Sequence, residues 1–190
     1  LGFRPHVQAK RLRGGGRTHN LALLFPLAHG GSFSYNTLET DFIVGASVAA
    51  NEGGYFFNLL TTPVNEGELL DLYRGGQVDG VVLMQIHARD PRVEALRTSD
   101  HPFVIIGRCA DNRGLSFIDL DFGTAVVTAF DHIIALGHRR IGFLALPHDL
   151  REQGYGPALR AWQGYEQALQ NHHLDPIYRE VSYDAQALLD

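Results

Sequence analysis

Polar and aromatic side chains follow five apolar runs of the sequence, at the positions where strands of a sheet would end. They are, in chain order, Phe33, Tyr35, Thr61, Gln85, Arg108 and Asp121. Aromatic rings stack on the C–H faces of sugars, whereas Arg, Asp and Gln side chains form paired hydrogen bonds with hydroxyl groups. With one cation and one anion, this set of residues predicts a site for a neutral, polyhydroxylated ligand.

Other chemistries have weaker support in the sequence. The phosphate-binding patterns GxGxxG and GxxxxGK[ST] are absent, as are the GxSxG and HExxH patterns of hydrolases. The ten histidines lack metal-ligand spacing, and Asp119 with Asp121 would be only two of the ligands that a Mg²⁺ or Ca²⁺ site needs. Cys109, the single cysteine, is typical of a small apolar residue. We therefore expect no catalytic residue, no metal and no cofactor.

The pattern of apolar residues predicts an α/β fold. Short apolar runs, typical of strands buried on both faces, lie at Leu21–Leu27, Tyr55–Leu60, Val81–Met84, Phe103–Ile106, Phe117–Leu120 and Ile141–Leu146. Longer stretches between them predict helices at Leu38–Asn51, Asn65–Gly75, Pro91–Arg97, Thr124–Leu136 and Pro157–Asn171. Alternating strands and helices indicate a parallel sheet flanked by helices. Ligands bind beyond the carboxyl ends of such strands, where the polar residues lie.

Several of these helices carry residues that favour a helix end. Asn65 precedes an acidic first turn, and Asp90 with Pro91 provides a cap and a first-turn residue. Gly137 follows Leu136 and is suited to the left-handed position after a helix.

The charge is distributed unevenly along the chain. The chain has 16 Lys and Arg against 21 Asp and Glu, and five of those cations lie in residues 1–18, before the first carboxylate at Glu39. Removing these five leaves 11 cations against 21 carboxylates in residues 19–190. A basic arm on an acidic body predicts that the arm contacts a polyanion.

The composition limits the class of protein. At 190 residues and 45% hydrophobic content, the chain is long enough for a buried core. It has no run of 18 apolar residues, which excludes a predicted membrane span. One cysteine allows no internal disulfide, and we expect a cytoplasmic protein.

Several stretches together resemble one family, the LacI-type bacterial transcriptional repressors. The matching stretches, in the family's order, are LGFRPHVQAKRLR (1–13), GYFFNLL (54–60), QVDGVVL (77–83), PFVIIGR (102–108), FIDLDFGTA (117–125), LGHRRIGFL (136–144) and GYEQAL (164–169). The resemblance covers essentially the whole chain. It implies a periplasmic-binding-protein-like fold with two subdomains.

The resemblance also implies a role for the basic arm. In the family, the segment that corresponds to residues 5–12 is the hinge between a helix-turn-helix headpiece and the effector domain. It folds into a short helix in the minor groove of the operator, where an apolar side chain acts as a wedge between base pairs. The implied hinge residues are Pro5, Ala9, Lys10, Leu12 and Arg13, with Leu12 as the wedge and the cations on phosphates.

The family's organisation gives three expected segments. Residues 1–18 would be the hinge to a headpiece that is absent from this chain, and residues 19–121 the N-terminal effector subdomain. Residues 122–190 would begin the C-terminal subdomain and leave it incomplete.

The family's effector contacts map unevenly onto this sequence. Arg108 and Asp121 match family positions that contact effectors. In many relatives an arginine stands three or five residues before the Gly-Tyr pair that corresponds to Gly164-Tyr165, whereas here Arg160 stands four residues before it. We expect Arg160 to contact the effector, although one position turns a helical side chain by about 100°.

The leading hypothesis from the sequence is therefore the effector-binding domain of a homodimeric, DNA-binding repressor that senses a mono- or disaccharide. The family's mechanism implies that the ligand closes a cleft between the subdomains and separates the paired hinge helices. A periplasmic sugar-binding protein of an importer is the alternative, and the basic hinge argues against it. A sugar-modifying enzyme is a third hypothesis, which lacks any assembled catalytic group.

Overall fold

The computed structural model describes residues 16–26 and 37–181 of the chain. The elements in chain order are β1 (Asn20–Leu24), α2 (Thr37–Glu52), β2 (Phe56–Leu60), α3 (Glu66–Arg74), β3 (Gly80–Leu83), α4 (Pro91–Arg97), β4 (Phe103–Ile106), β5 (Phe117–Ile118), α5 (Phe122–Ala135), β6 (Phe143–Ala145), α6 (His148–Glu152), α7 (Gly156–His172) and β7 (Tyr178–Glu180). The strands form a sheet of order β2-β1-β3-β4-β5 and a two-stranded sheet, β6-β7.

The contacts of the chain divide it into two compact units. The first contains the described residues up to Met84 together with Pro91–Ile105, and the second contains Gln85–Asp90 and the described residues from Ile106 onward. The two expected subdomains, 19–121 and 122–190, stay a prediction. The division by contacts falls earlier in the chain than the expected boundary.

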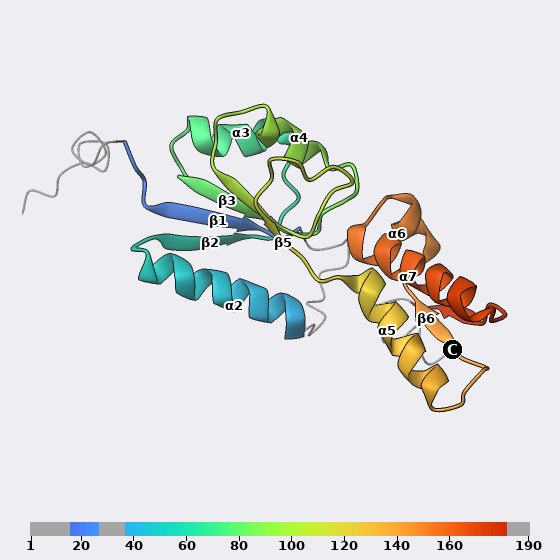
Figure 1. The fold of residues 1–190 in the computed structure, drawn as a ribbon. Helices are drawn as coiled ribbons and strands as arrows, with labels where there is room; N and C mark the ends of the chain where they lie inside the picture. The colour runs from blue at the N-terminus through green and yellow to red at the C-terminus, as the bar shows by residue number, and fades with distance from the viewer. Residues whose placement is uncertain (1–15, 27–36, 182–190) are drawn as a thin grey trace, which may run out of the picture. The chain divides into compact units, whose positions relative to one another are not determined.

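The first unit is a parallel sheet between helices. Strands β1, β2, β3 and β4 pair in parallel, as the apolar runs predicted. Helix α2 lies on one face of this sheet, and α3 and α4 lie on the other (Figure 1). Apolar side chains fill the space between these layers, and Leu23, Leu69, Leu83, Val93 and Leu96 are completely buried. The predicted fold class, a parallel sheet flanked by helices, is confirmed.

The predicted helix ends agree closely with the observed ones. The Asn65 side chain accepts a hydrogen bond from the Glu68 backbone N–H, and the Glu68 carboxylate accepts one from the Asn65 N–H, both at 2.9 Å. This reciprocal cap satisfies two N–H groups at the start of α3. Gly137 has a φ of 94° just after α5, in the left-handed region that favours glycine.

Asp79 holds the start of β1 to the start of β3. Its carboxylate accepts hydrogen bonds from the Thr18 N–H and hydroxyl, at 2.7 and 2.8 Å, and from the His19 N–H at 2.8 Å. Burial raises the pKa of the Asp79 carboxyl, but these hydrogen bonds outweigh burial and the net pKa is lowered. The aspartate of the VDG stretch therefore fixes the point at which the N-terminal arm joins the sheet.

Replacing Asp79 should weaken this junction. We expect Asp79→Asn to lower the free energy of unfolding by about 1–2 kcal/mol at neutral pH, because a neutral amide replaces a charged acceptor. The difference from wild type should be present above the ordinary pKa of aspartate and be lost as the pH falls through the lower folded-state pKa. Urea unfolding at several pH values measures this.

Asp71→Asn is the matched control for that experiment. Asp71 is an exposed residue of α3, paired with Arg74 at 3.3 Å, and an exposed pair of this kind contributes less than about 1 kcal/mol. An equal loss of stability in both variants would contradict the role assigned to Asp79.

The core of the second unit is aromatic. Tyr165 of α7 is 1% exposed, stacks on Phe143 of β6 with ring centroids 4.7 Å apart, and meets Phe130 of α5 edge-on at 5.7 Å. Ile141 and Ala168 complete the buried cluster. Large, rigid rings thus form the centre of this cluster. The tyrosine of the Gly164-Tyr165 pair is thus a core residue.

A pair of glycines allows α5 and α7 to approach closely. A Cβ built on Gly164 would lie within 2.9 Å of the Gly123 Cα and still closer to the Gly123 carbonyl oxygen. No side chain fits there, because the neighbouring atoms belong to the backbone of α5 and cannot rotate away. The glycine at position 164 is therefore required by helix packing.

We expect Gly164→Ala to lower the free energy of unfolding by about 1–3 kcal/mol, because it forces the two helices apart. Gly45→Ala is the control, since a Cβ on Gly45 in α2 would have no neighbouring atom within 4 Å. That variant should be neutral or more stable by up to about 1 kcal/mol, because alanine favours a helix over glycine. Thermal unfolding distinguishes the two outcomes, and equal behaviour of both variants would contradict the packing argument.

Two elements of the second unit were not predicted. Helix α6 and strand β7 carry few apolar residues, and β7 pairs in parallel with β6. Arg151 of α6 binds Glu180 of β7 at 2.6 Å and lies over the Trp162 ring at 4.1 Å. A charged side chain and an indole ring thus hold these elements, instead of an apolar face that sequence periodicity can reveal.

Candidate functional site

Two arginines of the second unit converge on one carboxylate. Asp119 follows β5 directly, and its Oδ2 lies 3.2 Å from Nε of Arg108 and 2.9 Å from Nη2 of Arg160. Arg108 stands two residues after β4, and Arg160 is in the second turn of α7. The guanidinium of Arg160 also donates a hydrogen bond to the Arg108 carbonyl oxygen at 3.2 Å. We refer to Arg108, Asp119 and Arg160 as the arginine–aspartate cluster.

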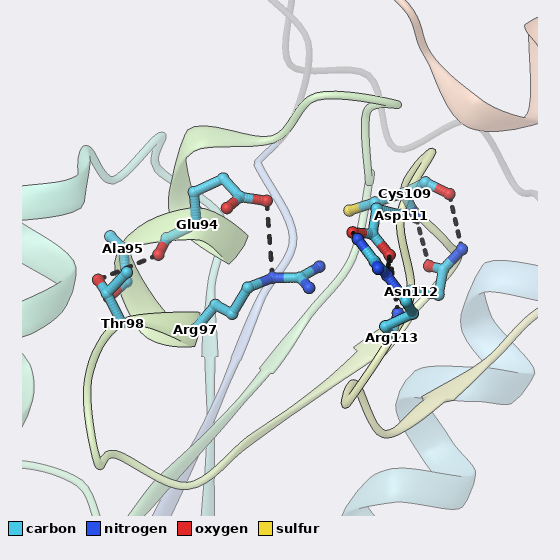
Figure 2. A network of polar contacts seen from close by, with 8 residues as sticks. All are labelled: Glu94, Ala95, Arg97, Thr98, Cys109, Asp111, Asn112 and Arg113. Atoms are coloured by element: carbon cyan, nitrogen blue, oxygen red, sulfur yellow. Dashed lines mark hydrogen bonds and ion pairs between the residues drawn. The ribbon is translucent and has the colours of Figure 1, made fainter.

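A glycine and several hydrogen bonds constrain the backbone around Arg108. Gly107 has a φ of 118°, and a Cβ there would lie 3.1 Å from the Ile86 side chain, so this position requires glycine. Its N–H donates to the Ile118 carbonyl oxygen at 2.8 Å. The Asn112 amide then binds the N–H and the carbonyl of Cys109, both at 2.8 Å (Figure 2). These bonds hold Arg108 next to Asp119.

The segment Gln85–Asp90, which follows β3, fixes the start of α7. The Gly156 N–H donates to the Ile86 carbonyl oxygen at 3.0 Å, and the Ala88 N–H donates to the Gly154 carbonyl oxygen at 2.7 Å. Gln85 begins this segment with a φ of 57°, an uncommon backbone conformation for a residue other than glycine. The segment therefore positions the helix that carries Arg160.

The members of the cluster differ in burial. The side chains of Asp119 and Arg160 are 9% and 12% exposed, whereas that of Arg108 is 35% exposed. Burial raises the pKa of the Asp119 carboxyl and lowers the pKa of Arg160, and each charge partly opposes the shift of the other. Nε of Arg160 is buried and has no hydrogen-bond partner among the described residues. A buried donor without a partner is uncommon in proteins and is available to a ligand.

Asp121 has a structural role of its own beside the cluster. It caps α5, accepting hydrogen bonds from the Thr124 N–H at 3.2 Å and from the Thr124 hydroxyl at 2.9 Å. These bonds, with smaller contributions from Arg108 and Arg160, lower the pKa of the exposed Asp121 carboxyl. Its Oδ1 lies 3.5 Å from Nη2 of Arg108, so the second carboxylate borders the site.

A metal centre has no support in the described part of the chain. Residues 16–26 and 37–181 contain no group of three or more His, Cys, Asp or Glu side chains arranged to hold a metal ion. Within the same residues, no helix combines the length and the apolar character needed to cross a membrane.

Comparisons with known proteins agree with this architecture. The chain is 32% identical over 152 residues to the HTH-type transcriptional regulator AglR of Rhizobium meliloti, a match that covers 78% of this chain and 42% of AglR. Among solved structures, a LacI-family regulatory protein from Chloroflexus aggregans matches with a TM-score of 0.71 and 26% identity, over 86% of this chain and 59% of that one. The chain is thus similar to LacI-type regulators over most of its length.

A further solved structure, the complex of the transcriptional regulator CelR with cellobiose, matches this chain with a TM-score of 0.69 and 27% identity. The match covers 91% of this chain and 54% of that one. No protein-family model matches the chain. The chain spans less than half of the length of AglR and little more than half of the solved LacI-type structures.

The structure brings together three of the residues that the sequence predicted as effector contacts. Arg108, Asp121 and Arg160 lie around Asp119 in the second unit, and Gln85 belongs to the same unit. Their role in binding an effector stays a prediction.

The other residues predicted from the sequence do not belong to this cluster. Thr61 lies in the first unit, just after β2. Phe33 and Tyr35 lie outside the described residues, as do the hinge residues Pro5, Ala9, Lys10, Leu12 and Arg13.

Sequence reasoning missed two residues of the site. Asp119 was considered only as half of a weak metal pair, although its spacing from Asp121 would place both carboxylates on one side of a strand. Asn112 fixes the loop that carries Arg108, and it left no signal beyond an amide in a polar loop.

A substitution at Gly156 tests whether the Arg160 guanidinium can be moved without unfolding the protein. A Cβ on Gly156 would lie 2.7 Å from Nη2 and 2.9 Å from Nη1 of Arg160. The guanidinium is the end of a flexible side chain, so Gly156→Ala should displace it from Asp119 and leave the backbone of α7 in place, at a cost of about 1–3 kcal/mol in stability. The NMR signal of the Arg160 Nε–H measures the displacement.

Gly45→Ala should leave that signal unchanged, because Gly45 is an exposed residue of the first unit. An unshifted Arg160 signal in Gly156→Ala would show that the guanidinium is not held where the structure places it.

Proposed function

We propose that this LacI-type chain is the effector-binding domain of a transcriptional repressor that responds to a sugar. The arginine–aspartate cluster gives the strongest support. Guanidinium groups donate paired hydrogen bonds, carboxylates accept them, and vicinal hydroxyls of a sugar can satisfy both. The buried Nε of Arg160, which has no partner among the described residues, supplies a donor for such a hydroxyl. The CelR–cellobiose complex, a structural neighbour, supports a sugar as the class of ligand.

The residues divide the work of binding as follows. Arg160 and Arg108 donate to sugar hydroxyls, and Asp121 accepts from a hydroxyl at the exposed side of the cluster. Gln85, Thr61, Phe33 and Tyr35 are further proposed contacts, the two aromatic residues by stacking on the sugar ring. No catalytic group is proposed, and the curated relatives AglR and CelR are transcriptional regulators.

The second proposed binding partner, besides the sugar, is operator DNA. The arm of residues 1–18 carries five cations and no carboxylate, which suits contacts to phosphates. A homodimer acting in the cytoplasm would present two such arms to a two-fold symmetric operator. The sugar changes DNA affinity only if it binds one conformation of the protein better than the other, and couplings of this kind amount to about 1–3 kcal/mol.

The importer alternative from the sequence has less support. AglR of Rhizobium meliloti and CelR of Thermobifida fusca, at 32% and 34% identity, are both HTH-type regulators.

The test of the proposed function is thermal unfolding of the protein with a panel of mono- and disaccharides that includes cellobiose. A sugar at 100 times its dissociation constant should stabilise the protein by about 2.7 kcal/mol, which shifts the unfolding temperature measurably. Arg160→Gln should remove most of the shift, because it removes the buried donor and one cation of the cluster.

Arg113→Gln is the matched control, since Arg113 is an exposed residue of the same unit, paired with Asp111 at 2.8 Å, and should leave the shift unchanged. A protein that no sugar stabilises, or an Arg160→Gln variant that responds like wild type, would contradict the proposal.

A further inference from the structure

Two arginines that converge on one point form an anion site unless something occupies it. Guanidinium groups bind carboxylate and phosphate oxygens in a paired geometry, and they hold such anions more strongly than neutral groups. In this chain, Nε of Arg108 and Nη2 of Arg160 both lie within 3.2 Å of one oxygen atom, Oδ2 of Asp119. The protein therefore supplies its own anion at the position where a free anion would bind.

The Asp119 carboxylate cannot readily leave this position. Its side chain is 9% exposed, and the Arg160 side chain against it is 12% exposed, so neither charge has an alternative partner in water. Asp119 also follows a β-strand directly, which fixes its backbone. Arg108 is the most exposed member of the cluster, with 35% of its side chain exposed.

The charges around the cluster sum to zero. Among the described residues of the second unit, the charged groups that face it are the two guanidiniums and the carboxylates of Asp119 and Asp121, and Asp121 lies 3.5 Å from Arg108. An incoming phosphate group would place its negative charge beside both carboxylates. Like charges in direct contact repel strongly in a partly buried site. A neutral polyol meets the same donors and acceptors without that repulsion.

We propose that Asp119 is the specificity-determining residue of this site, and that its carboxylate makes the Arg108–Arg160 pair select neutral ligands and reject phosphorylated ones. This inference rests on the proposed function, since it assigns the effector to this cluster. Asp119 acts through the two arginines: it holds their guanidiniums in place for hydroxyl groups and blocks the direct approach of an anion. Without it, the same two arginines would bind phosphate.

A purely structural role predicts a different behaviour. If Asp119 only links α7 to the residue after β5, its replacement lowers stability in every buffer by the same amount. If it occupies an anion site, the loss depends on the anion present, because phosphate can take the place of the missing carboxylate.

The experiment compares thermal unfolding of wild type and Asp119→Asn in inorganic phosphate and in chloride at equal ionic strength. Wild type should be only slightly more stable in phosphate than in chloride, by the general effect of a salt that is excluded from the protein surface. Asp119→Asn should fold less stably in chloride and regain stability in phosphate, with a phosphate affinity about 10- to 100-fold above that of wild type. Isothermal titration with phosphate gives the affinities directly, and circular dichroism confirms that the variant is folded.

Three further variants locate the effect. Asp119→Glu keeps the charge and should exclude phosphate as wild type does. Asp119→Asn combined with Arg160→Gln should lose the phosphate response, because only one guanidinium remains. Asp111→Asn removes an equal charge from an exposed aspartate–arginine pair of the same unit, and it should show no phosphate response beyond that of wild type.

Three results would overturn the proposal. They are a wild type that phosphate stabilises as much as it stabilises Asp119→Asn, an Asp119→Asn variant that stays unfolded in phosphate, and a phosphate response equal in Asp119→Asn and Asp111→Asn. The phosphate measurements need no known sugar, so they can succeed even if the saccharide panel fails, and the two proposals can be refuted separately.

Discussion

The geometry of the second unit depends on where α7 begins. Backbone hydrogen bonds from Gly156 to Ile86 and from Ala88 to Gly154 set its first turn against the segment after β3. Further along, Gly164 lets the helix pack directly on the backbone of α5 at Gly123. Because these contacts involve backbone atoms, the helix has little freedom to slide or turn. The position of α7 therefore holds Arg160 beside the carboxylate of Asp119, which follows β5.

The arginine–aspartate cluster contributes little to the stability of the fold for the number of charges it buries. Moving charges out of water costs free energy that their mutual attraction often fails to recover, and apolar residues of similar volume frequently do better. Burial is the largest cause of both pKa shifts: it raises the pKa of Asp119 and lowers that of Arg160. In each case burial disfavours the charged form of the side chain. A group of buried charges with an unused donor therefore supports the proposed role in ligand binding more than a role in stability.

Much of the first unit could be predicted from the sequence, because its elements follow strong local rules. Strand β4 and helix α4 have the predicted bounds, and Asn65 caps α3 as its type and position indicated. The second unit was less predictable. Its helix α6 and strand β7 are held by Arg151 with Glu180 and Trp162, contacts between residues far apart in the chain. Periodicity detects apolar faces, and it carries no information about such long-range polar pairs.

The site shows why position along a helix alone is a weak guide to a long side chain. Arg160 stands one residue away from both positions at which the sequence resemblance places an arginine, although we expect it to contact the effector. A helical side chain leans toward the helix N-terminus and covers the residue about four positions earlier. That residue here is Gly156, whose missing side chain leaves the space that the guanidinium occupies. The direction of the Arg160 side chain thus depends on the residue one turn earlier, so the two residues have to be considered together.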